Sequence, residues 1–265
     1  MFRVSCIQLK SNNNIQSNFI KTERLIKKAI SQKADFILTP EVSSLFTLNK
    51  KLLLDQCTSM DKDEYLRGIK KLAKKHKKWI LIGSLVIKTG KNTLVNRSVL
   101  INSKGRIQSY YDKIHMYDVT LSKKESYLES RTFVAGKKHQ ISRLPWGKLG
   151  MSVCYDLRFP NLYRNLAKKG SLFLSIPSAF TQTTGKRHWH SLLKARAIEN
   201  FCYIFAPAHG GTNYNGRKTF GHSLIISPDG KIIKELGKKE GVITASVDPK
   251  KAKKLRLIIP SLKKD

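Results

Sequence analysis

The stretch GMSVCYDLRFP, from Gly150 to Pro160, places a cysteine at the end of a short apolar run. Residues 151–153 are typical of a buried strand, and residues 161–169, beyond the break, are compatible with a helix. A rigid strand that ends in a sharp turn is a setting in which a nucleophile is held exposed above the edge of a sheet. By residue type alone, however, Cys154 is more often a buried structural cysteine. The choice between these two roles therefore depends on the rest of the chain.

The chain of 265 residues is long enough to bury a substantial core, and 40% of its residues are hydrophobic. No internal repeat, low-complexity tract or linker interrupts it. We therefore predict a single domain over residues 1–265.

Strand-like and helix-like segments alternate along the chain, which predicts an α/β fold. Turn signals at Lys104-Gly105 and Pro228-Asp229-Gly230 indicate hairpins, and therefore mixed rather than purely parallel sheets. The predicted strands are 2–8, 36–39, 79–87, 94–102, 149–153, 172–176, 202–206, 223–227, 231–234 and 242–247. The predicted helices are 18–31, 63–76, 161–169 and 188–200.

The formal net charge is +33, a value that raises the question of nucleic-acid binding. The lysines are dispersed over every segment instead of forming one stripe or tail, and no helix-turn-helix, RNP or KH pattern accompanies them. We therefore predict no specific nucleic-acid partner. A positive surface can still steer small anionic substrates toward a cleft.

The cysteines are widely spaced and contain no CxxC pair, which argues against both a disulfide scaffold and a zinc finger. The longest apolar run, 79–87, is less than half of the ~20 residues that a membrane helix needs. With no secretory signal visible at the start of the sequence, we expect a reducing cytoplasm and no membrane association. The four cysteines are Cys6, Cys57, Cys154 and Cys202.

Four histidines, together with Cys202, raise the question of a metal site. His188 and His190 fall on a predicted helix, where residues two apart do not share a face. Neither the HxxxH spacing nor HxH on a strand is present. We therefore predict no metal and no cofactor. The other two histidines in question are His209 and His222.

Three polar side chains each follow a strand-like run. Glu41 comes directly after 36–40, where Pro40 ends the strand, Lys113 follows Tyr110-Tyr111-Asp112, and Cys154 follows 151–153. Ligands meet catalytic groups at the carboxyl ends of strands in α/β sheets. Each residue alone is weak evidence, since most such charges are solvated loop residues. In combination they indicate one site.

In this order and context the three residues resemble the Glu-Lys-Cys triad of the nitrilase, or carbon–nitrogen hydrolase, superfamily. The resemblance extends over nearly the whole chain, from 4–8 (VSCIQ) to 259–262 (IPSL). It implies a four-layer α-β-β-α sandwich with mixed sheets, assembled into homodimers or larger homo-oligomers. The specific blocks are 39–41 (TPE), 112–115 (DKIH), 154–160 (CYDLRFP), 178–181 (SAFT), 184–185 (TG) and 192–200 (LLKARAIEN).

The resemblance implies a thiol-dependent amidase. Cys154 attacks the amide carbonyl and forms a thioester, while Glu41 moves protons to the departing ammonia and from water. Lys113, with the backbone N–H of Tyr155, stabilises the oxyanion. A fixed cation beside the sulfur also favours the thiolate.

The family pattern also implies a second glutamate that positions Lys113. Glu129 fits by its spacing to Gly136, and Glu125, which is also followed by serine, is the rival. Members of the family often carry Glu where His190 stands. This difference bears on substrate contacts or on a pair at the helix surface, and it leaves the triad intact.

Blocks 178–181 and 195–200 are most similar to the Nit branch, which contains amidases of deaminated glutathione and ω-amidases of 2-oxoglutaramate-type amides. Ser178 and 195–197 favour the former, and Ser178 and Phe180 are expected to contact substrate. Arg158 or Arg196 can pair with a substrate carboxylate, and Arg158 can equally be a structural residue bonded to Asp156 or to backbone. N-carbamoyl amino acid hydrolysis uses the same triad. The alternative of another class is a non-catalytic basic binding protein on this fold.

Overall fold

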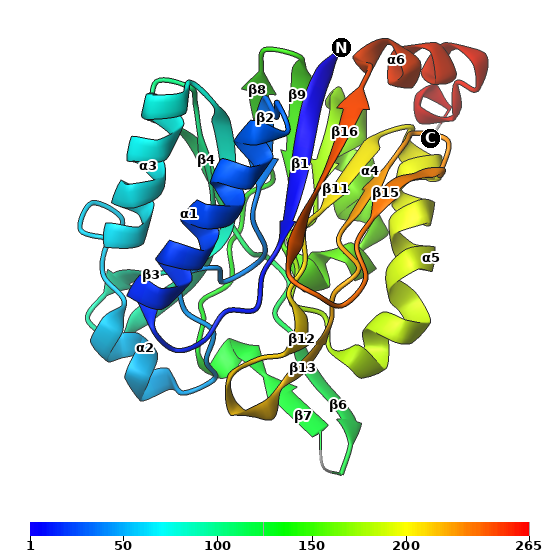
Figure 1. The fold of residues 1–265 in the computed structure, drawn as a ribbon. Coiled ribbons are helices and arrows are strands. Elements are labelled where there is room, and N and C mark those ends of the chain that lie inside the picture. Colours follow the sequence, from blue (N-terminus) through cyan, green and yellow to red (C-terminus); the bar gives the residue numbers. More distant parts are fainter. Residues whose placement is uncertain (124, 265) are drawn as a thin grey trace.

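Two six-stranded sheets packed face to face form the centre of the molecule, as described by a computed structural model of residues 1–123 and 125–264 (Figure 1). The strand order in the first sheet is β16-β1-β2-β3-β4-β5. The strand bounds are β1 Phe2–Gln8, β2 Phe36–Leu38, β3 Trp79–Gly90, β4 Thr93–Ile101, β5 Ile107–Asp112 and β16 Gly241–Val247.

The second sheet has the order β15-β14-β11-β10-β9-β8. Its strand bounds are β8 Gln140–Leu144, β9 Gly147–Met151, β10 Ser171–Ser175, β11 Tyr203–Ala206, β14 Leu224–Ile226 and β15 Ile232–Glu235. The predicted mixed sheets are confirmed, because β1, β2 and β3 pair in parallel while β4, β5 and β16 pair antiparallel to their neighbours.

The two sheets share one pairing pattern. Counted from β16 in the first sheet and from β8 in the second, the successive pairings are antiparallel, parallel, parallel, antiparallel and antiparallel. The sequence carries no visible repeat because hydrophobic pattern, and not residue identity, determines which strands are buried. The two sheets therefore have the same pattern of parallel and antiparallel pairs, although the edge strand β16 comes from the end of the chain and its counterpart β8 does not.

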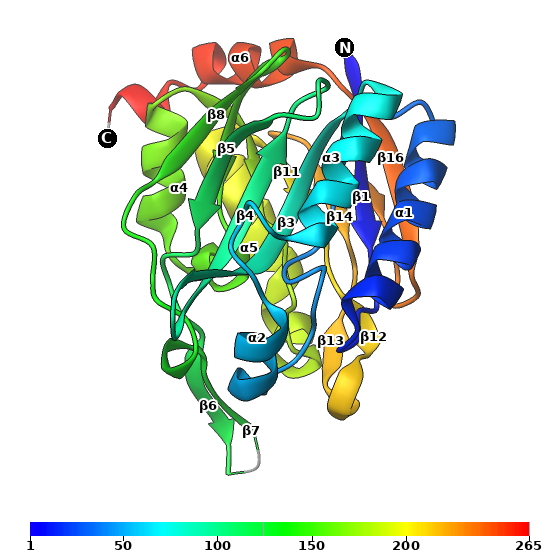
Figure 2. The ribbon, with the colours of Figure 1, turned by 90° about the vertical axis from the view of Figure 1, so that its left-hand side faces the viewer.

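Helices cover the outer face of each sheet, which confirms the predicted four layers (Figures 1 and 2). On the first sheet lie α1 (Ile15–Ser31) and α3 (Glu64–His76), and on the second α4 (Pro160–Lys168) and α5 (Gln182–Asn200). The side chain of Asn14 caps α1 by accepting from Ser17 N. Buried side chains of α1 and α3 pack on β1, β2 and β3 in one apolar cluster.

Aromatic side chains fill the space between the two sheets. Phe36 of the first sheet meets Phe205 of the second edge-on at 6.2 Å between ring centroids, and Phe2 meets Phe173 at 5.4 Å. The first strand also pairs with the last along its whole length, from Phe2 opposite Val247 to Gln8 opposite Gly241. The two ends of the chain are therefore joined within one sheet.

Shorter elements surround one end of the sandwich. The hairpins β6 (Asp118–Ser122)–β7 (Glu125–Leu128) and β12 (Gly210–Thr212)–β13 (Lys218–Phe220) project there, beside α2 (Lys50–Gln56) (Figure 1). The sequence did not predict these elements, nor β8 or α6 (Pro249–Ile258). Helix α5 begins at Gln182 and not at residue 188, because Thr181 caps it by accepting from Thr184 N. The single-turn helices are η1 Glu129–Arg131, η2 Cys154–Arg158, η3 Tyr214–Gly216 and η4 Ser261–Lys263.

Among the helices of the described chain, none combines the length and the apolar character that a membrane span requires.

Candidate active site

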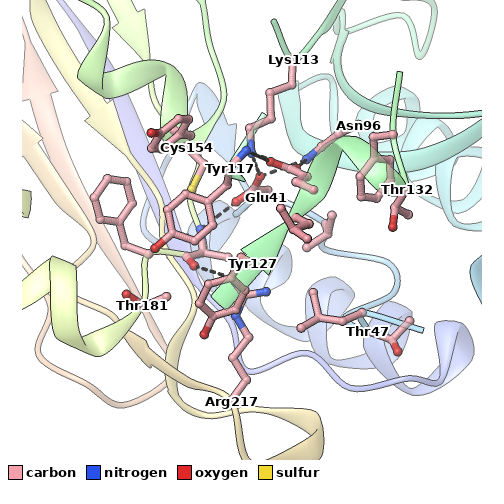
Figure 3. A pocket seen from close by; sticks show the side chains of 18 of the residues that line it. Glu41, Thr47, Asn96, Lys113, Tyr117, Tyr127, Thr132, Cys154, Thr181 and Arg217 are labelled. Atoms are coloured by element: carbon pink, nitrogen blue, oxygen red, sulfur yellow. Dashed lines mark hydrogen bonds and ion pairs between the residues drawn. The ribbon is translucent and has the colours of Figure 1, made fainter. Parts of the chain in front are cut away.

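A cavity of about 210 Å³ opens where strands of both sheets end (Figure 3). Glu41 follows β2, Lys113 follows β5 and Cys154 follows β9, and all three line the cavity. The first two residues come from one sheet and the third from the other. The structure thus brings together side chains that the sequence placed separately at strand ends.

The turn that carries Glu41 is fixed by three hydrogen bonds to Ser84. Val42 N donates to Ser84 Oγ at 2.7 Å, Ser43 N donates to Ser84 O at 3.1 Å, and Ser84 N donates to Pro40 O at 3.2 Å. Val42 has a φ of +42°, which is unfavourable for a β-branched residue. Such strain persists only where the surroundings over-determine the backbone, as these bonds do.

Gly83 makes this turn sterically possible. A Cβ atom built at Gly83 would lie 2.0 Å from Thr39 O, 2.4 Å from Pro40 O and 2.5 Å from Pro177 Cβ. Residues 39 and 40 directly precede Glu41, so any side chain at Gly83 would displace the carboxylate. Close approach of two backbones is a general reason for glycine in a strand.

Lys113 is almost fully buried between two carboxylates. Its Nζ donates to Glu41 Oε1 at 2.9 Å and to both oxygens of Glu129 at 2.9 and 2.8 Å. Burial on its own lowers the pKa of Lys113, but the charges of Glu129 and Glu41 outweigh burial and raise it well above the ordinary lysine value. The ammonium is therefore a fixed cation.

Glu41 is ionised in this network. Its Oε1 also accepts from Asn96 Nδ2 at 2.9 Å, and its Oε2 accepts from Ala179 N at 3.0 Å. Burial raises the pKa of Glu41, but the charge of Lys113 and the hydrogen bonds from Cys154 and Lys113 outweigh it, so the pKa lies below the ordinary glutamate value. The ionised Glu41 carboxylate is therefore available to accept a proton from a nearby group.

Cys154 has a strained backbone, with a φ of +50°, and its N–H donates to Pro177 O at 2.9 Å. Burial and the charge of Glu41 raise the pKa of its thiol well above the ordinary cysteine value, although Lys113 acts in the opposite direction. Lys113 thus favours the thiolate, as expected, but burial and Glu41 together have the larger effect on the pKa of the thiol. Glu41 and Cys154 line the same cavity, so the carboxylate is available as a base for the thiol.

Asp156 connects the nucleophile turn to the segment that follows Lys113. Its carboxylate, fully buried, accepts from Val153 N at 2.8 Å, from Tyr111 Oη at 2.8 Å and from His115 N at 3.0 Å. His115 Nδ1 lies 2.7 Å from the same carboxylate. One side chain therefore fixes the position of Cys154 relative to Lys113 across the interface between the sheets.

The structure distinguishes the two rival glutamates. Glu129 contacts Lys113, and its Oε2 also accepts from Tyr117 N at 2.6 Å. Glu125 instead accepts from Tyr127 Oη at 3.3 Å and from Thr183 Oγ1 at 3.1 Å. Only Glu129 of this pair lines the cavity.

Of the expected substrate-binding residues, Tyr155 and Phe180 line the cavity, and the N–H of Tyr155 lies in the first turn of η2, where N–H groups lack an acceptor within the helix. Arg158 is not among the described lining residues, but it lies beside two of them, because its Cζ is 5.9 Å from the ring centroid of Tyr155 and 5.6 Å from that of Phe180. Its Nη2 lies 3.2 Å from His188 Nδ1. Ser178 is absent from the described lining residues, since its hydroxyl donates to Ile176 O in the interior.

Arg196 is a structural residue. Its guanidinium, a buried group of α5, donates to Leu157 O at 3.1 and 2.9 Å and to Glu199 Oε1 at 2.9 Å. Two of these bonds satisfy one carbonyl group of η2, and Arg196 is not among the described lining residues of the cavity. A role in carboxylate binding is therefore not available to it.

Among the lining residues that the sequence did not predict, Asn96 and Arg217 bear most directly on the chemistry. Asn96 lies in the middle of β4 and donates to both Glu41 and Glu129, at 2.9 and 3.3 Å. Arg217 donates from Nη2 to Ala179 O at 3.3 Å and lies 5.1 Å from the ring centroid of Tyr127 (Figure 3). The only sequence signal for Asn96 was a polar residue within an apolar strand. Arg217 had no sequence signal that distinguished it from the other 50 of the 51 lysines and arginines.

His209 is fully buried behind Glu41, with its Nε2 2.6 Å from the carbonyl oxygen of Glu41. Burial lowers the pKa of His209 to about 4, so the imidazole is neutral near pH 7. His209 therefore adds no positive charge beside Lys113. Its other nitrogen, Nδ1, lies 3.3 Å from Leu9 O, so the ring lies between the backbone carbonyl groups of Leu9 and Glu41.

A model of the carbon–nitrogen hydrolase family matches residues 3–257. The chain belongs to the carbon–nitrogen hydrolase family. As a member, it is a carbon–nitrogen hydrolase of the nitrilase superfamily that acts on non-peptide amides. The expected family and reaction class are confirmed.

Its relatives include the deaminated glutathione amidase of Synechocystis, with 37% identity over 98% of this chain and 97% of that protein. The omega-amidase of Saccharomyces cerevisiae is 29% identical over 98% of this chain and 92% of that protein. The crystal structure of the C. elegans NitFhit protein superposes with a TM-score of 0.93 at 33% identity. It covers 100% of this chain, which spans 65% of the C. elegans chain.

Proposed function

We propose that this hydrolase cleaves the amide of a small carboxylate-bearing substrate through a thioester on Cys154, with release of ammonia from a primary amide or of the amine from a substituted one. The observation that carries the proposal is the buried Lys113, held by Glu41 and Glu129 in the cavity that Cys154 also lines. A carboxylate, an ammonium and a thiol in one enclosed site supply a base, an oxyanion partner and a nucleophile.

Acylation begins as Cys154 Sγ attacks the amide carbon while its proton passes to Glu41. The C=O electron pair moves onto oxygen, where Lys113 Nζ and the backbone N–H of Tyr155 stabilise the charge. As the oxyanion collapses, the C–N bond breaks and Glu41 returns the proton to the leaving nitrogen. Ammonia, or the amine of a substituted amide, departs and the acyl group remains as a thioester.

Deacylation repeats these steps with water. Glu41 takes a proton from a water molecule whose oxygen attacks the thioester carbon. The second oxyanion meets the same two donors, and its collapse breaks the C–S bond. The proton returns to sulfur, so the carboxylic acid leaves and Cys154 is again a thiol.

Arg217 favours a substrate that carries a carboxylate. It is a cation in the lining of the cavity, held by Ala179 O and by the faces of Tyr127 and Phe46, with both ring centroids 5.1 Å from its Cζ. A guanidinium held in one orientation pairs with carboxylates through two parallel hydrogen bonds. Both deaminated glutathione and 2-oxoglutaramate carry such a carboxylate, and the similarity to the Synechocystis protein favours the former as the substrate.

The proposal is tested by release of cysteinylglycine from deaminated glutathione and by ammonia release from 2-oxoglutaramate, glutamine, asparagine and carbamoyl amino acids. The Cys154→Ala variant should release none. Arg217→Gln should raise KM for carboxylate-bearing amides by about 10- to 100-fold, the effect of losing a hydrogen bond to a charged group. Lys218→Gln, which changes the exposed neighbour on β13, is the matched control and should leave KM unchanged.

The outcomes separate the alternatives. Preference for 2-oxoglutaramate identifies an ω-amidase, and preference for carbamoyl amino acids an N-carbamoyl hydrolase. Unchanged hydrolysis by Cys154→Ala refutes the thioester mechanism. No turnover of any amide, with salt-sensitive binding to DNA or RNA, favours a non-catalytic basic binding protein.

We also propose that residues 1–265 act as one domain that self-associates in the cytoplasm. Three apolar side chains at the end of α6 support self-association, because Leu257, Ile258 and Ile259 are 74%, 62% and 50% exposed. Light scattering coupled to size exclusion tests this, and a monomer at every concentration would contradict it.

A further inference from the structure

Two imidazoles and a carboxylate meet on the second sheet, away from the catalytic cavity. His190 Nε2 lies 2.9 Å from Glu235 Oε1, and His222 Nδ1 lies 2.6 Å from the same oxygen. The three ligand atoms all lie within 4.8 Å of one another. None of the three residues is among the described residues that line the catalytic cavity.

The backbone around these side chains is fixed by its own contacts. Trp189, next to His190 on α5, donates from Nε1 to His222 O at 2.8 Å. His222 N donates to Gly237 O at 3.0 Å, and Leu224 of β14 is paired with Glu235 of β15. The helix, the loop and the strand that carry the three side chains are therefore tied to one another independently of those side chains.

His222 is held in an uncommon conformation, with a φ of +54° directly after Gly221 at +76°. Its ring stacks on Phe220, with centroids 4.3 Å apart, and Phe220 also meets His190 edge-on at 5.9 Å. The aromatic contacts restrict both imidazoles. Both rings are thus directed toward Glu235 before any ligand is bound.

Two imidazole nitrogens and one carboxylate oxygen form a ligand set typical of first-row transition metals, and of zinc in particular. At bond lengths of about 2.0–2.2 Å, ligand atoms on one tetrahedral ion lie roughly 3.4 Å apart. The present separations of 2.9 and 2.6 Å therefore need to widen by less than ~1 Å, a change within reach of side-chain rotation at these partly exposed positions.

We propose that His190, His222 and Glu235 bind a divalent transition-metal ion such as Zn²⁺, at a site separate from the catalytic cavity. This departs from the expectation of no metal, which considered His190 with His188. The helix does separate those two, since His188 lies against Arg158, but Glu235 supplies the missing ligand from another element. The ion would join α5 to β14 and β15 and stabilise the folded chain.

Zinc titration against a chromophoric chelator tests the site. His190→Gln and Glu235→Gln each remove one ligand, and each should weaken Zn²⁺ binding at least about tenfold, because loss of an outer-shell partner alone costs 10- to 100-fold. His188→Gln, two residues away on the same helix, should bind Zn²⁺ like the wild type. Zn²⁺ should also raise the Tm of the wild type and of His188→Gln above that of the metal-free protein, and leave the Tm of the two ligand variants unchanged.

Cobalt distinguishes this site from the buried thiols. Co²⁺ bound by imidazole and carboxylate gives weak visible bands, whereas a Cys154 ligand adds an intense thiolate charge-transfer band in the near ultraviolet. The proposal is overturned if the wild type binds no Zn²⁺, if both ligand variants bind it as tightly as the wild type, or if the bound Co²⁺ carries the thiolate band. Glu235→Gln preserves side-chain shape on the surface, so the test holds even if His190→Gln folds poorly.

Discussion

Replacement of Glu129 by glutamine separates the charge of this residue from its shape. Each of its oxygens accepts from two donors: Oε1 from Lys113 and Asn96, and Oε2 from Lys113 and Tyr117 N. In either orientation, the amide NH₂ introduced by Glu129→Gln would face two N–H donors. Lys113 would therefore lose a partner and move away from the position in which it meets the oxyanion.

The structure sets the size of the effect. Unit charges 2.8 Å apart attract by about 6 kcal/mol at an effective dielectric constant near 20, and desolvation offsets much of this. Loss of one positioned oxyanion donor costs about 10²–10³ in kcat, or about 3–4 kcal/mol. We expect Glu129→Gln to lower kcat for ammonia release by that factor, with a small change in KM.

Glu125→Gln is the matched control, because Glu125 contacts only Tyr127 and Thr183 among the described residues. Its kcat should stay within about threefold of the wild type, as for a surface residue with neutral partners. Thermal melting establishes that both variants are folded. If Glu129→Gln retained more than a tenth of the wild-type kcat, or if Glu125→Gln lost as much activity, the assignment of Glu129 would be refuted.

The thiol, the glycine at the Glu41 turn and the buried aspartate each allow a further test. Burial and Glu41 raise the pKa of Cys154 well above its ordinary value. The rate of alkylation by iodoacetamide should therefore rise about tenfold per pH unit up to pH 8, because only the thiolate reacts. A rate that levels off at lower pH would show a resting thiolate and contradict this expectation. Gly83→Ala should reduce kcat more than 100-fold or prevent folding, whereas Gly237→Ala, where an added Cβ has no atom within 4 Å, should do neither in the same assay. Asp156→Asn should lower unfolding free energy in urea by about 2–4 kcal/mol, because its new NH₂ faces buried donors, and an unchanged midpoint would contradict this account.

The parts of the site that follow strands could be predicted from the sequence. A strand end is a local property, set by an apolar run and a break such as Pro40, so the positions of Glu41, Lys113 and Cys154 at strand ends could be predicted from their neighbours, whereas their roles rest on the family resemblance. The first and last residues of the predicted strands agree with the strand bounds in the structure to within a few residues for the same reason.

The missed residues depend on contacts between distant segments. Asn96 faces Glu41 from the middle of a buried strand, and Arg217 enters the cavity from a loop whose course depends on β12 and β13. The partner of His190 is Glu235, which no spacing rule connects to a helix. Ser178 shows the opposite kind of error. It belongs to a recognisable motif and was expected to contact substrate, but its hydroxyl donates to Ile176 O in the interior.

The division of the active site between the two sheets has a consequence for how the protein matures. Glu41 and Lys113 are synthesised before Cys154, and the first sheet is completed only when β16 pairs with β1. Such pairing between the ends of the chain is a late and slow step in folding. We therefore expect the thiol to gain its base and its cation late in folding, when the first sheet is complete. In a refolding experiment, the return of ammonia release should report the closure of the first sheet.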